Sequence, residues 1–256
     1  MISISVIGAG QVGKKFCKAI NAAENLHLEQ WYNRSKINPR IGLSNVHFCY
    51  DLMELKPVDL YIIAVSDSAV ETISNALPFE NRLVVHTSGS VPLRYLNKKN
   101  RKGVFYPLQT FSDASDLPFS KVPICIETTD IIDRKLLKKV ATALESPTYF
   151  IESDQRQSLH LSAVFVNNFT NQLFRIAHEL TDLHGIEFDI LKPLIKETTQ
   201  KLDKMSPYMA QTGPAKRKDK KTIEQHLRML DKAPKYKKIY ELLTQSIQNT
   251  HDKKKL

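Results

Sequence analysis

Short apolar runs alternate with helical patterns over the first 150 residues of the chain. Apolar side chains recur at helical spacing in three segments, 12–20, 69–77 and 131–145. The run at 59–66 is almost continuously apolar, as expected of a strand buried on both faces. This alternation predicts an α/β fold with a doubly wound, mostly parallel Rossmann-type sheet. The predicted strands cover 2–8, 27–33, 46–50, 59–66, 82–89, 102–108, 122–127 and 148–151.

The pattern changes after residue 152. No glycine or proline interrupts the helical period between Asp154 and His184, which predicts one long helix. Further helical periods cover 189–205, 222–232 and 236–249. We therefore predict an all-helical C-terminal domain after the Rossmann-type domain. The predicted divisions are 1–152 for the NADP-binding domain, 153–251 for the helical substrate and dimerisation domain, and 252–256 for a basic tail.

A G-x-G-x-x-G string joins the first predicted strand to the first predicted helix. In a β–α–β unit the first glycine permits a tight turn, the second lets the backbone approach a pyrophosphate, and the third lets the helix pack closely on the strand. The amides at the helix start then face the phosphates. We expect a dinucleotide to contact Gly8, Gly10, Gln11, Val12 and Gly13, and the alternative is a purely structural turn.

The end of the second predicted strand selects the cofactor. NAD-binding proteins usually place Asp or Glu there to hold the ribose 2′-hydroxyl, whereas this chain has Asn33, Arg34 and Ser35. The planar guanidinium of Arg34 suits a phosphate, and the other two side chains add neutral hydrogen bonds. The sequence therefore predicts NADP(H) rather than NAD. The alternative makes Arg34 a solvated surface residue.

Polar residues follow the fourth and fifth predicted strands, where a Rossmann-type sheet binds its ligand. We expect the cofactor to contact Val65, Ser66, Asp67, Thr87 and Ser88. His86 is a candidate general acid that would donate a proton to the substrate. The alternatives are a structural histidine at a strand end, with Thr87 and Ser88 in an ordinary turn or helix cap.

The predicted long helix carries a polar stripe within its apolar pattern, made of His160, Asn167, Asn171 and His178. We predict that His160 and Asn167 are catalytic and face the substrate, because polar groups on a mostly apolar helix face a cleft or pair with one another. Buried hydrogen bonds between helices, or a dimer seam, are the alternative. Gln109 and Asn168 are further candidates for substrate contacts.

The segment 212–219 is a basic loop before a helix start. Arg217 is predicted to bind a substrate carboxylate or phosphate, with Asp219 orienting it. Residues 222–225 have the form of a capping box for the next helix. The alternative is a solvated basic loop with ordinary helix capping.

Charge and composition narrow the possible partners. The net charge is +10, from 37 Lys and Arg against 27 Asp and Glu, but the basic runs lack interleaved aromatic residues and any nucleic-acid module. We expect no nucleic acid, no membrane and no metal as a partner, because no long apolar run and no metal-ligand spacing occurs. Three scattered cysteines and the absence of a signal-peptide pattern favour a cytoplasmic protein.

Several motifs together resemble the 6-phosphogluconate-dehydrogenase-like superfamily, which includes pyrroline-5-carboxylate reductase. They are the glycine string, "NRS" at 33–35, "AVSD" at 64–67 and the helical C-terminal half. "HTSGS" at 86–90, "YPLQTF" at 106–111 and the segment 212–227 are similar to an uncharacterised bacterial family. That family joins a Rossmann-like N-terminal domain to a helical C-terminal domain of unknown function. The resemblance implies the fold, an NADP cofactor and a homodimer formed through the helical domain, and it supplies no substrate.

Two positions depart from the patterns of these relatives. The β-hydroxyacid dehydrogenases have a catalytic lysine in a K-x-x-N-N pattern, and Val164 stands at the lysine position here. Tyr106 stands where the family usually has histidine. The first departure argues against hydroxyacid dehydrogenation by the usual lysine, and the second against a histidine role at that position.

We therefore predict an NADP(H)-dependent oxidoreductase that acts on a small carbonyl, imine or hydroxy substrate. His86 or His160 would donate the proton, and Asn167 and Arg217 would orient the substrate. Two alternatives stay open, an NADP-binding sensor or interaction protein without hydride transfer and a nucleic-acid binder that uses the basic C-terminal face. It also stays open whether a deazaflavin takes the place of the substrate in the cleft.

Overall fold

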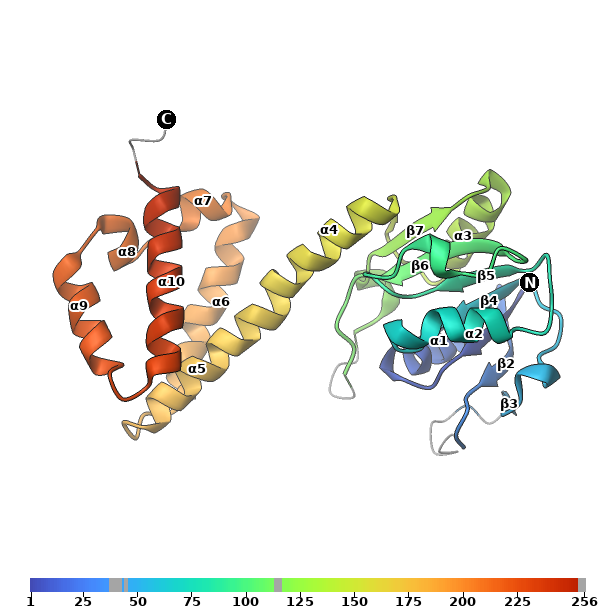
Figure 1. Cartoon of the computed structure of the whole chain (residues 1–256), viewed down its shortest axis with the longest axis horizontal. Helices are drawn as coiled ribbons and strands as arrows, with labels where there is room; N and C mark the ends of the chain where they lie inside the picture. The colour runs from blue at the N-terminus through green and yellow to red at the C-terminus, as the bar shows by residue number, and fades with distance from the viewer. Residues whose placement is uncertain (37–42, 44–45, 113–116, 253–256) are drawn as a thin grey trace. The chain divides into compact units, whose positions relative to one another are not determined.

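The computed structural model describes residues 1–36, 43, 46–112 and 117–252 (Figure 1). The chain divides into two compact units, Met1–Asn167 and Asn168–Leu256. This division falls inside the predicted long helix, fifteen residues after the predicted boundary at 152. Residues 253–256 of the predicted basic tail lie outside the described residues. The two units are described separately below.

The first unit is built on an eight-stranded sheet with the order β3-β2-β1-β4-β5-β6-β7-β8. All neighbouring strands are parallel except β6 and β7, which are antiparallel. The direction in which successive strands are added to the sheet reverses at β1, with β2 and β3 on one side of it and β4 to β8 on the other. The carboxyl ends of β1 and β4 therefore form a topological switch point. The predicted Rossmann-type fold is confirmed. The strands are β1 Ile2–Ile7, β2 Leu26–Tyr32, β3 His47–Cys49, β4 Leu60–Ile63, β5 Leu83–His86, β6 Arg101–Pro107, β7 Ile124–Thr128 and β8 Thr148–Phe150.

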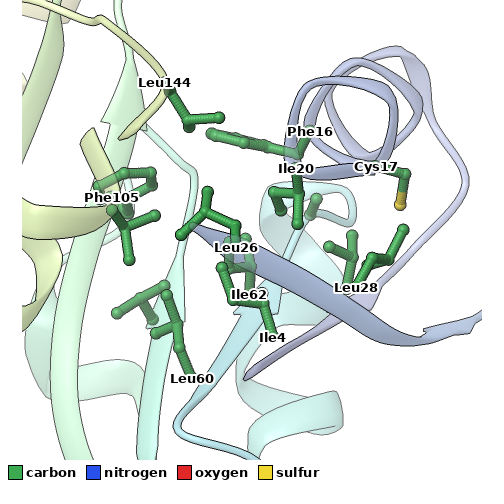
Figure 2. Packing of buried hydrophobic residues seen from close by; sticks show 14 of the residues in the cluster. Ile4, Phe16, Cys17, Ile20, Leu26, Leu28, Leu60, Ile62, Phe105 and Leu144 are labelled. Carbon is green, nitrogen blue, oxygen red and sulfur yellow. The ribbon is translucent and has the colours of Figure 1, made fainter. Parts of the chain in front are cut away.

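Both faces of the sheet are buried, because alternate side chains of each central strand point to opposite faces. Leu60 and Ile62 of β4 belong to one apolar cluster, and Tyr61 and Ile63 belong to another. Figure 2 shows the first cluster, in which Phe16 and its neighbours from α1 pack on residues of the sheet. The helices of this unit before the long helical segment are α1 Gln11–Ala22, α2 Val70–Ala76 and α3 Ile131–Ala143.

The predicted long helix is interrupted by a π-helical turn. α4 Ser153–Ala163 leads into the π turn Val164–Phe169, and α5 Thr170–Asp182 follows. A π turn closes hydrogen bonds over five residues instead of four, so it changes the face on which later residues lie. The prediction that polar residues from His160 to His178 form one stripe on a continuous α-helix is therefore wrong.

The second unit is helical. The predicted helix over 189–205 is divided into a 3₁₀ turn Phe188–Leu191, α6 Lys192–Gln200 and a second 3₁₀ turn Lys201–Asp203. None of the helices in the described part of the chain combines the length and the apolar character that a membrane span needs. The remaining helices are α7 Pro207–Ala210, α8 Pro214–Arg217, α9 Lys220–Met229 and α10 Pro234–Thr250.

Candidate functional site

A cavity of about 500 Å³ lies at the carboxyl ends of the central strands of the first unit. This is the switch point between β1 and β4, where open α/β sheets bind ligands. Most of the residues predicted to bind the cofactor line it, namely Gly8, Gly10, Gln11, Val12, Asn33, Val65, Ser66, Asp67, Thr87 and Ser88. Ala9, Ala64, Gly89 and His160 complete the described lining. The described lining thus contains one carboxylate and no Lys or Arg.

The three glycines of the string have different surroundings. Gly8 has φ +114°, and a Cβ there would lie 2.3 Å from the Ala64 carbonyl oxygen. A Cβ on Gly13 would lie 2.1 Å from the Gly8 carbonyl oxygen, so Gly13 serves the packing of α1 and does not line the cavity. A Cβ on Gly10 would meet no protein atom within 4 Å. The open space at Gly10 therefore has room for a ligand against the backbone.

The start of α1 also fits an anionic group. Gly10 is its N-cap residue, and no side chain caps the helix. The first amides of a helix lack partners within the helix and attract phosphates. An NADP pyrophosphate therefore fits the space beside Gly10, where the protein has neither a side chain nor a cap.

The residues after β2 divide into one structural side chain and two exposed ones. The Asn33 Oδ1 accepts a hydrogen bond from the Ala9 amide at 3.2 Å, and its Nδ2 donates to the Ser35 carbonyl oxygen at 2.8 Å. Asn33 therefore ties the strand end to the glycine loop. Arg34 and Ser35 are exposed and outside the described lining, and the Arg34 guanidinium makes no hydrogen bond with another described residue.

His86 lies beneath the cavity and not in its lining. Its side chain is 0 % exposed, and its Nδ1 accepts a hydrogen bond from the Ser88 amide at 3.2 Å. Burial, helped by the charge of Arg156, lowers the pKa of His86 to about 3, so the ring is neutral near pH 7. The prediction that His86 donates a proton is therefore corrected, because the ring is inaccessible and uncharged. It has the structural role that the sequence left as the alternative.

Hydrogen bonds from and to the hydroxyls of Ser88 and Ser90 hold the turn that follows His86. The Ser88 Oγ accepts hydrogen bonds from the Ser90 and Val91 amides at 3.1 and 3.0 Å. The Ser90 hydroxyl in turn donates a hydrogen bond to the carboxylate of Asp67, which links the segments after β4 and β5. The turn that borders the cavity is therefore well defined before any ligand binds.

His160 of α4 is the predicted catalytic residue that lines the cavity. Its Nδ1 lies 3.2 Å from the hydroxyl of Tyr106 on β6. Tyr106 is buried, and this burial raises the pKa of its hydroxyl to about 12. Sequence reasoning used Tyr106 only as a departure from the family pattern. The structure makes it the neighbour of the cavity histidine.

Asn167 and Gln109, the other predicted substrate residues of the first unit, are absent from the described lining of this cavity. The Asn167 side chain donates a hydrogen bond to the Thr110 hydroxyl, and the Gln109 side chain accepts one from the Thr110 amide. Asn168 and Arg217 belong to the second unit, where both are exposed. Asp219 is the N-cap of α9 and binds the Thr222 amide and hydroxyl, so the helix begins three residues before the predicted capping box.

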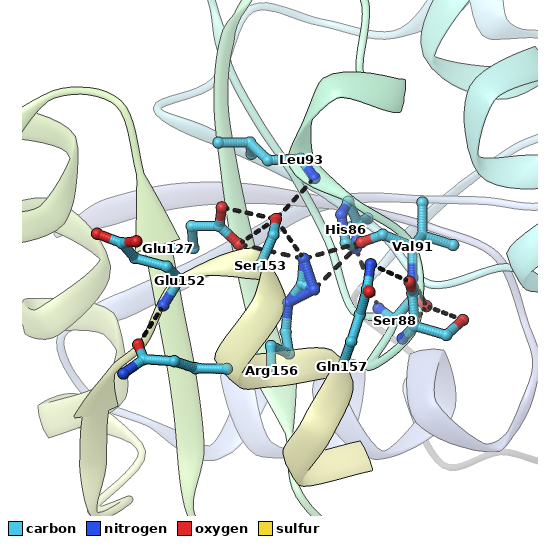
Figure 3. A network of polar contacts seen from close by, with 11 residues as sticks. His86, Ser88, Val91, Leu93, Glu127, Glu152, Ser153, Arg156 and Gln157 are labelled. Carbon is cyan, nitrogen blue, oxygen red and sulfur yellow. Dashed lines mark hydrogen bonds and ion pairs between the residues drawn. The ribbon is translucent and has the colours of Figure 1, made fainter. Parts of the chain in front are cut away.

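A buried arginine network, shown in Figure 3, was missed by sequence reasoning. Arg156 of α4 is 0 % exposed, donates to the Val91 carbonyl oxygen at 2.8 Å and pairs with Glu127 at 3.1 Å. Its guanidinium also donates to the Ser153 hydroxyl at 3.2 Å, and the Gln157 side chain donates to the Ser90 carbonyl oxygen at 3.3 Å. The network therefore joins the cavity turn to the helix that carries His160. A basic residue in a helix gives no sequence signal of such burial.

A second cavity of similar volume, about 490 Å³, lies near the start of α4. Its lining includes Glu127 and Ser153, which are already bonded to each other and to Arg156. The described residues contain no group of three or more His, Cys, Asp or Glu side chains placed to hold a metal ion. The cavity beside the glycine string is therefore the candidate functional site.

Comparisons with known proteins agree with this geometry. The family model "Domain of unknown function (DUF2520)" matches residues 122–247. A crystal structure titled "putative NADP oxidoreductase" from Bacteroides fragilis is 38% identical, with 97% of this chain and 98% of that chain covered and a TM-score of 0.87. No curated protein gives a significant match.

More distant structures share the fold. Plasmodium falciparum pyrroline carboxylate reductase with NADP bound is 14% identical, with 98% of this chain and 100% of that chain covered and a TM-score of 0.60. An imine reductase from Myxococcus stipitatus in complex with NADP+ is 13% identical, with coverage of 96% and 93% and a TM-score of 0.67. Both of these structures contain the cofactor that the sequence predicts, NADP.

Proposed function

This chain belongs to the same protein family as the Bacteroides fragilis protein, and from that premise we propose that it is an NADP(H)-dependent oxidoreductase of small carbonyl or imine compounds. The observation that carries the proposal is the cavity at the switch point, where the open face of Gly10 and the uncapped start of α1 border the same space. Pyrroline carboxylate and imine reductases share the fold and support this reaction class.

The chain provides groups for each part of the cofactor. Gly10 and the first amides of α1 would hold the pyrophosphate. Arg34, exposed after β2, would hold the 2′-phosphate, with Ser35 beside it. Ser66 and Thr87 would border the rest of the dinucleotide, because both line the same cavity. When bound, NADPH supplies the hydride.

His160 would act on the substrate. It lines the cavity together with the turn 87–89, and its position there suits a hydrogen bond to the oxygen or nitrogen of a reacting double bond. Reduction of that bond takes one hydride at carbon and one proton at the heteroatom. The side chain of His160 would donate a hydrogen bond to the heteroatom and so polarise the double bond, and the heteroatom would take its proton from solvent.

The first test is a fluorescence titration with NADPH and NADH. We expect NADPH to bind at least tenfold more tightly, which corresponds to about 1.4 kcal/mol, and Arg34→Ala to remove the preference. Arg228→Ala, which removes an exposed arginine from α9 in the second unit, is the matched control and should keep it. Equal binding of the two nucleotides would contradict the assignment of Arg34, and binding of neither would contradict the proposed function.

One observation favours a second candidate, an NADP-binding sensor without hydride transfer. Val164 stands where the β-hydroxyacid dehydrogenases have their catalytic lysine, and it lies in the π turn rather than in the described cavity lining. A sensor would bind NADPH with the same dependence on Arg34, but it would not oxidise NADPH whatever compound was offered as substrate. Steady oxidation of NADPH by any carbonyl or imine compound removes this candidate.

We also propose a homodimer formed through the helical unit. Among the described residues of that unit, the buried hydrophobic residues are Ile176, Ala215 and Leu230. Large apolar side chains such as Ile190 and Leu194 are instead 69 % and 63 % exposed. A unit with so few buried residues needs another apolar surface, and a second copy supplies one.

A further inference from the structure

A buried tyrosine lies behind the histidine of the cavity. Tyr106 is 8 % exposed, and its ring meets the His160 ring edge-on, with the ring centroids 6.1 Å apart. Gly89 closes the same edge of the histidine, since a Cβ there would lie 2.6 Å from Nδ1 and 2.7 Å from the Tyr106 Cζ. The Nδ1 edge of His160 is therefore enclosed by the protein.

The direction of the Tyr106–His160 hydrogen bond follows from burial. The tyrosine hydroxyl has no other hydrogen-bond partner among the described residues. If Nδ1–H donated to the tyrosine oxygen, the phenolic proton of this buried residue would have no acceptor among the described residues, which is destabilising. If the hydroxyl donates instead, its proton is satisfied. The hydroxyl keeps that proton at physiological pH, because burial raises its pKa to about 12. The hydroxyl therefore donates, and Nδ1 accepts.

We propose that Tyr106 is a positioning residue that holds neutral His160 in the tautomer with its proton on Nε2. A neutral imidazole carries one proton, so acceptance at Nδ1 puts it on Nε2. Nε2, which is separated from the enclosed Nδ1 by Cε1, has no hydrogen-bond partner among the described residues, and the ring lines the cavity. The cavity thus presents an N–H donor.

This tautomer narrows the substrate class, an extension that rests on the proposed function. An N–H donor fits a heteroatom with a free lone pair, as in a carbonyl oxygen or a neutral imine nitrogen. A protonated Nε2 cannot accept the hydroxyl proton that a hydroxy compound would have to give up on oxidation. The pyrophosphate would be held by the backbone amides at the start of α1. Near His160, by contrast, the described lining offers the carboxylate of Asp67, which is bonded to the Ser90 hydroxyl beside Gly89, and no Lys or Arg to balance an anionic substrate. The site therefore fits an uncharged carbonyl or imine compound.

The surrounding network supports the arrangement. Arg156 and Gln157 of α4 donate to the carbonyl oxygens of Val91 and Ser90, just after Gly89. These bonds hold the turn with Gly89 and the helix with His160 against each other. The ring is thus held on two sides, by the tyrosine hydroxyl and by the backbone of the turn. A group held in this way needs little reorganisation when a ligand binds.

The decisive experiment measures the histidine tautomer by ¹⁵N NMR in the full-length protein with labelled histidine. His160→Gln identifies the signals of His160 by their loss. We expect the wild-type ring, in its neutral form, to show Nε2–H and an unprotonated Nδ1. Tyr106→Phe should convert it to a mixture of tautomers, whereas Tyr149→Phe, which removes a hydroxyl from a side chain 55 % exposed on β8, should not.

The outcomes separate the inference from the proposed function. A wild-type ring with its proton on Nδ1, or a tautomer unchanged by Tyr106→Phe, overturns the role of Tyr106. A wild-type ring with its proton on Nδ1 overturns this role even if the Tyr106 variant does not fold. The measurement needs no cofactor, so failure to bind NADPH would overturn the function and leave the tautomer assignment standing.

The substrate class is tested on the NADP+-bound protein with two matched ketones. We expect butanone to shift the Nε2 signal of His160 and to do so at lower concentration than pyruvate, which carries a carboxylate. Tyr106→Phe should weaken the butanone response at least threefold while leaving the affinity for NADP+ unchanged. A response to pyruvate at lower concentration, or to neither ketone, overturns the assignment of an uncharged substrate.

Discussion

At the scale of single residues, burial gives different roles to two histidines that lie near the carboxyl ends of the strands. His86 is fully buried and accepts a hydrogen bond from the Ser88 amide, so it holds the turn and does not reach the cavity. His160 lines the cavity and has Nε2 free of partners among the described residues. Residue type and sequence position favour neither one, and only their surroundings separate a structural histidine from a candidate catalytic one.

The buried His86 predicts a pH-dependent stability. Its pKa of about 3 in the folded protein is below the value of about 6.5 in the unfolded chain, so acid favours unfolding as pH falls from about 6.5 towards 3. His86→Asn keeps an acceptor for the Ser88 amide and removes the titration. Between pH 7 and pH 5 the wild-type free energy of unfolding should fall by about 2 kcal/mol more than that of the variant. Urea unfolding at both pH values measures this, and equal losses would contradict it.

At the scale of elements, the junction of β1 and α1 gives the glycines of one motif different tasks. Gly8 and Gly13 are required by the protein itself, because a Cβ at either position would overlap a backbone oxygen. Gly10 is not required by any protein contact, since a Cβ there would enter open space. The fold therefore does not require glycine at this position, and the missing side chain leaves room for the pyrophosphate that we propose here. Under this proposal the motif combines packing and binding within six residues.

This difference predicts opposite effects for two alanine substitutions. Gly10→Ala should leave the melting temperature within about 1 °C of wild type and weaken NADPH binding at least tenfold, since the methyl group would occupy the space of the pyrophosphate. Gly13→Ala should lower the melting temperature by several degrees, because α1 would have to move away from β1. Thermal unfolding and fluorescence titration measure both. Normal NADPH affinity in Gly10→Ala would contradict a pyrophosphate at this loop.

At the scale of the whole molecule, the two units differ in how much apolar surface each buries alone. The first unit buries both faces of its sheet, whereas few hydrophobic residues are buried in the described part of the second. Conformational entropy opposes the folding of both units alike, so the second unit needs a further apolar contact to be stable. The contact that we propose is a second copy of the chain.

Light scattering after gel filtration tests this proposal. We expect a mass of twice 29.3 kDa for the wild type. The double substitution Ile190→Asp and Leu194→Asp should shift the mass towards that of one chain, because charges on an apolar contact resist burial. Lys196→Asp, a charge change at an exposed position of α6, is the control and should stay dimeric. A monomeric wild type would exclude the dimer.

The sequence alone determined the order of the elements, the sheet and the cofactor class. Local patterns carry this information, because alternating apolar runs identify buried strands and the glycine string needs only its own strand and helix. Within a few residues, the predicted strands are those of the structure, and most of the predicted cofactor residues line one cavity. The π turn was not predictable, since helical periodicity does not distinguish hydrogen bonds over four residues from bonds over five.

Only the tertiary structure decided which polar groups face the cavity and which support it. Tyr106 and His160 are 54 residues apart, and Arg156 and Val91 are 65 residues apart, yet each pair is in direct contact. Burial, which sets the charge of His86 and the donor role of Tyr106, is likewise a property of the packed molecule. The physical reason is that hydrogen-bond direction and protonation depend on neighbours brought together by folding, whereas backbone preference and apolar periodicity act over a few consecutive residues.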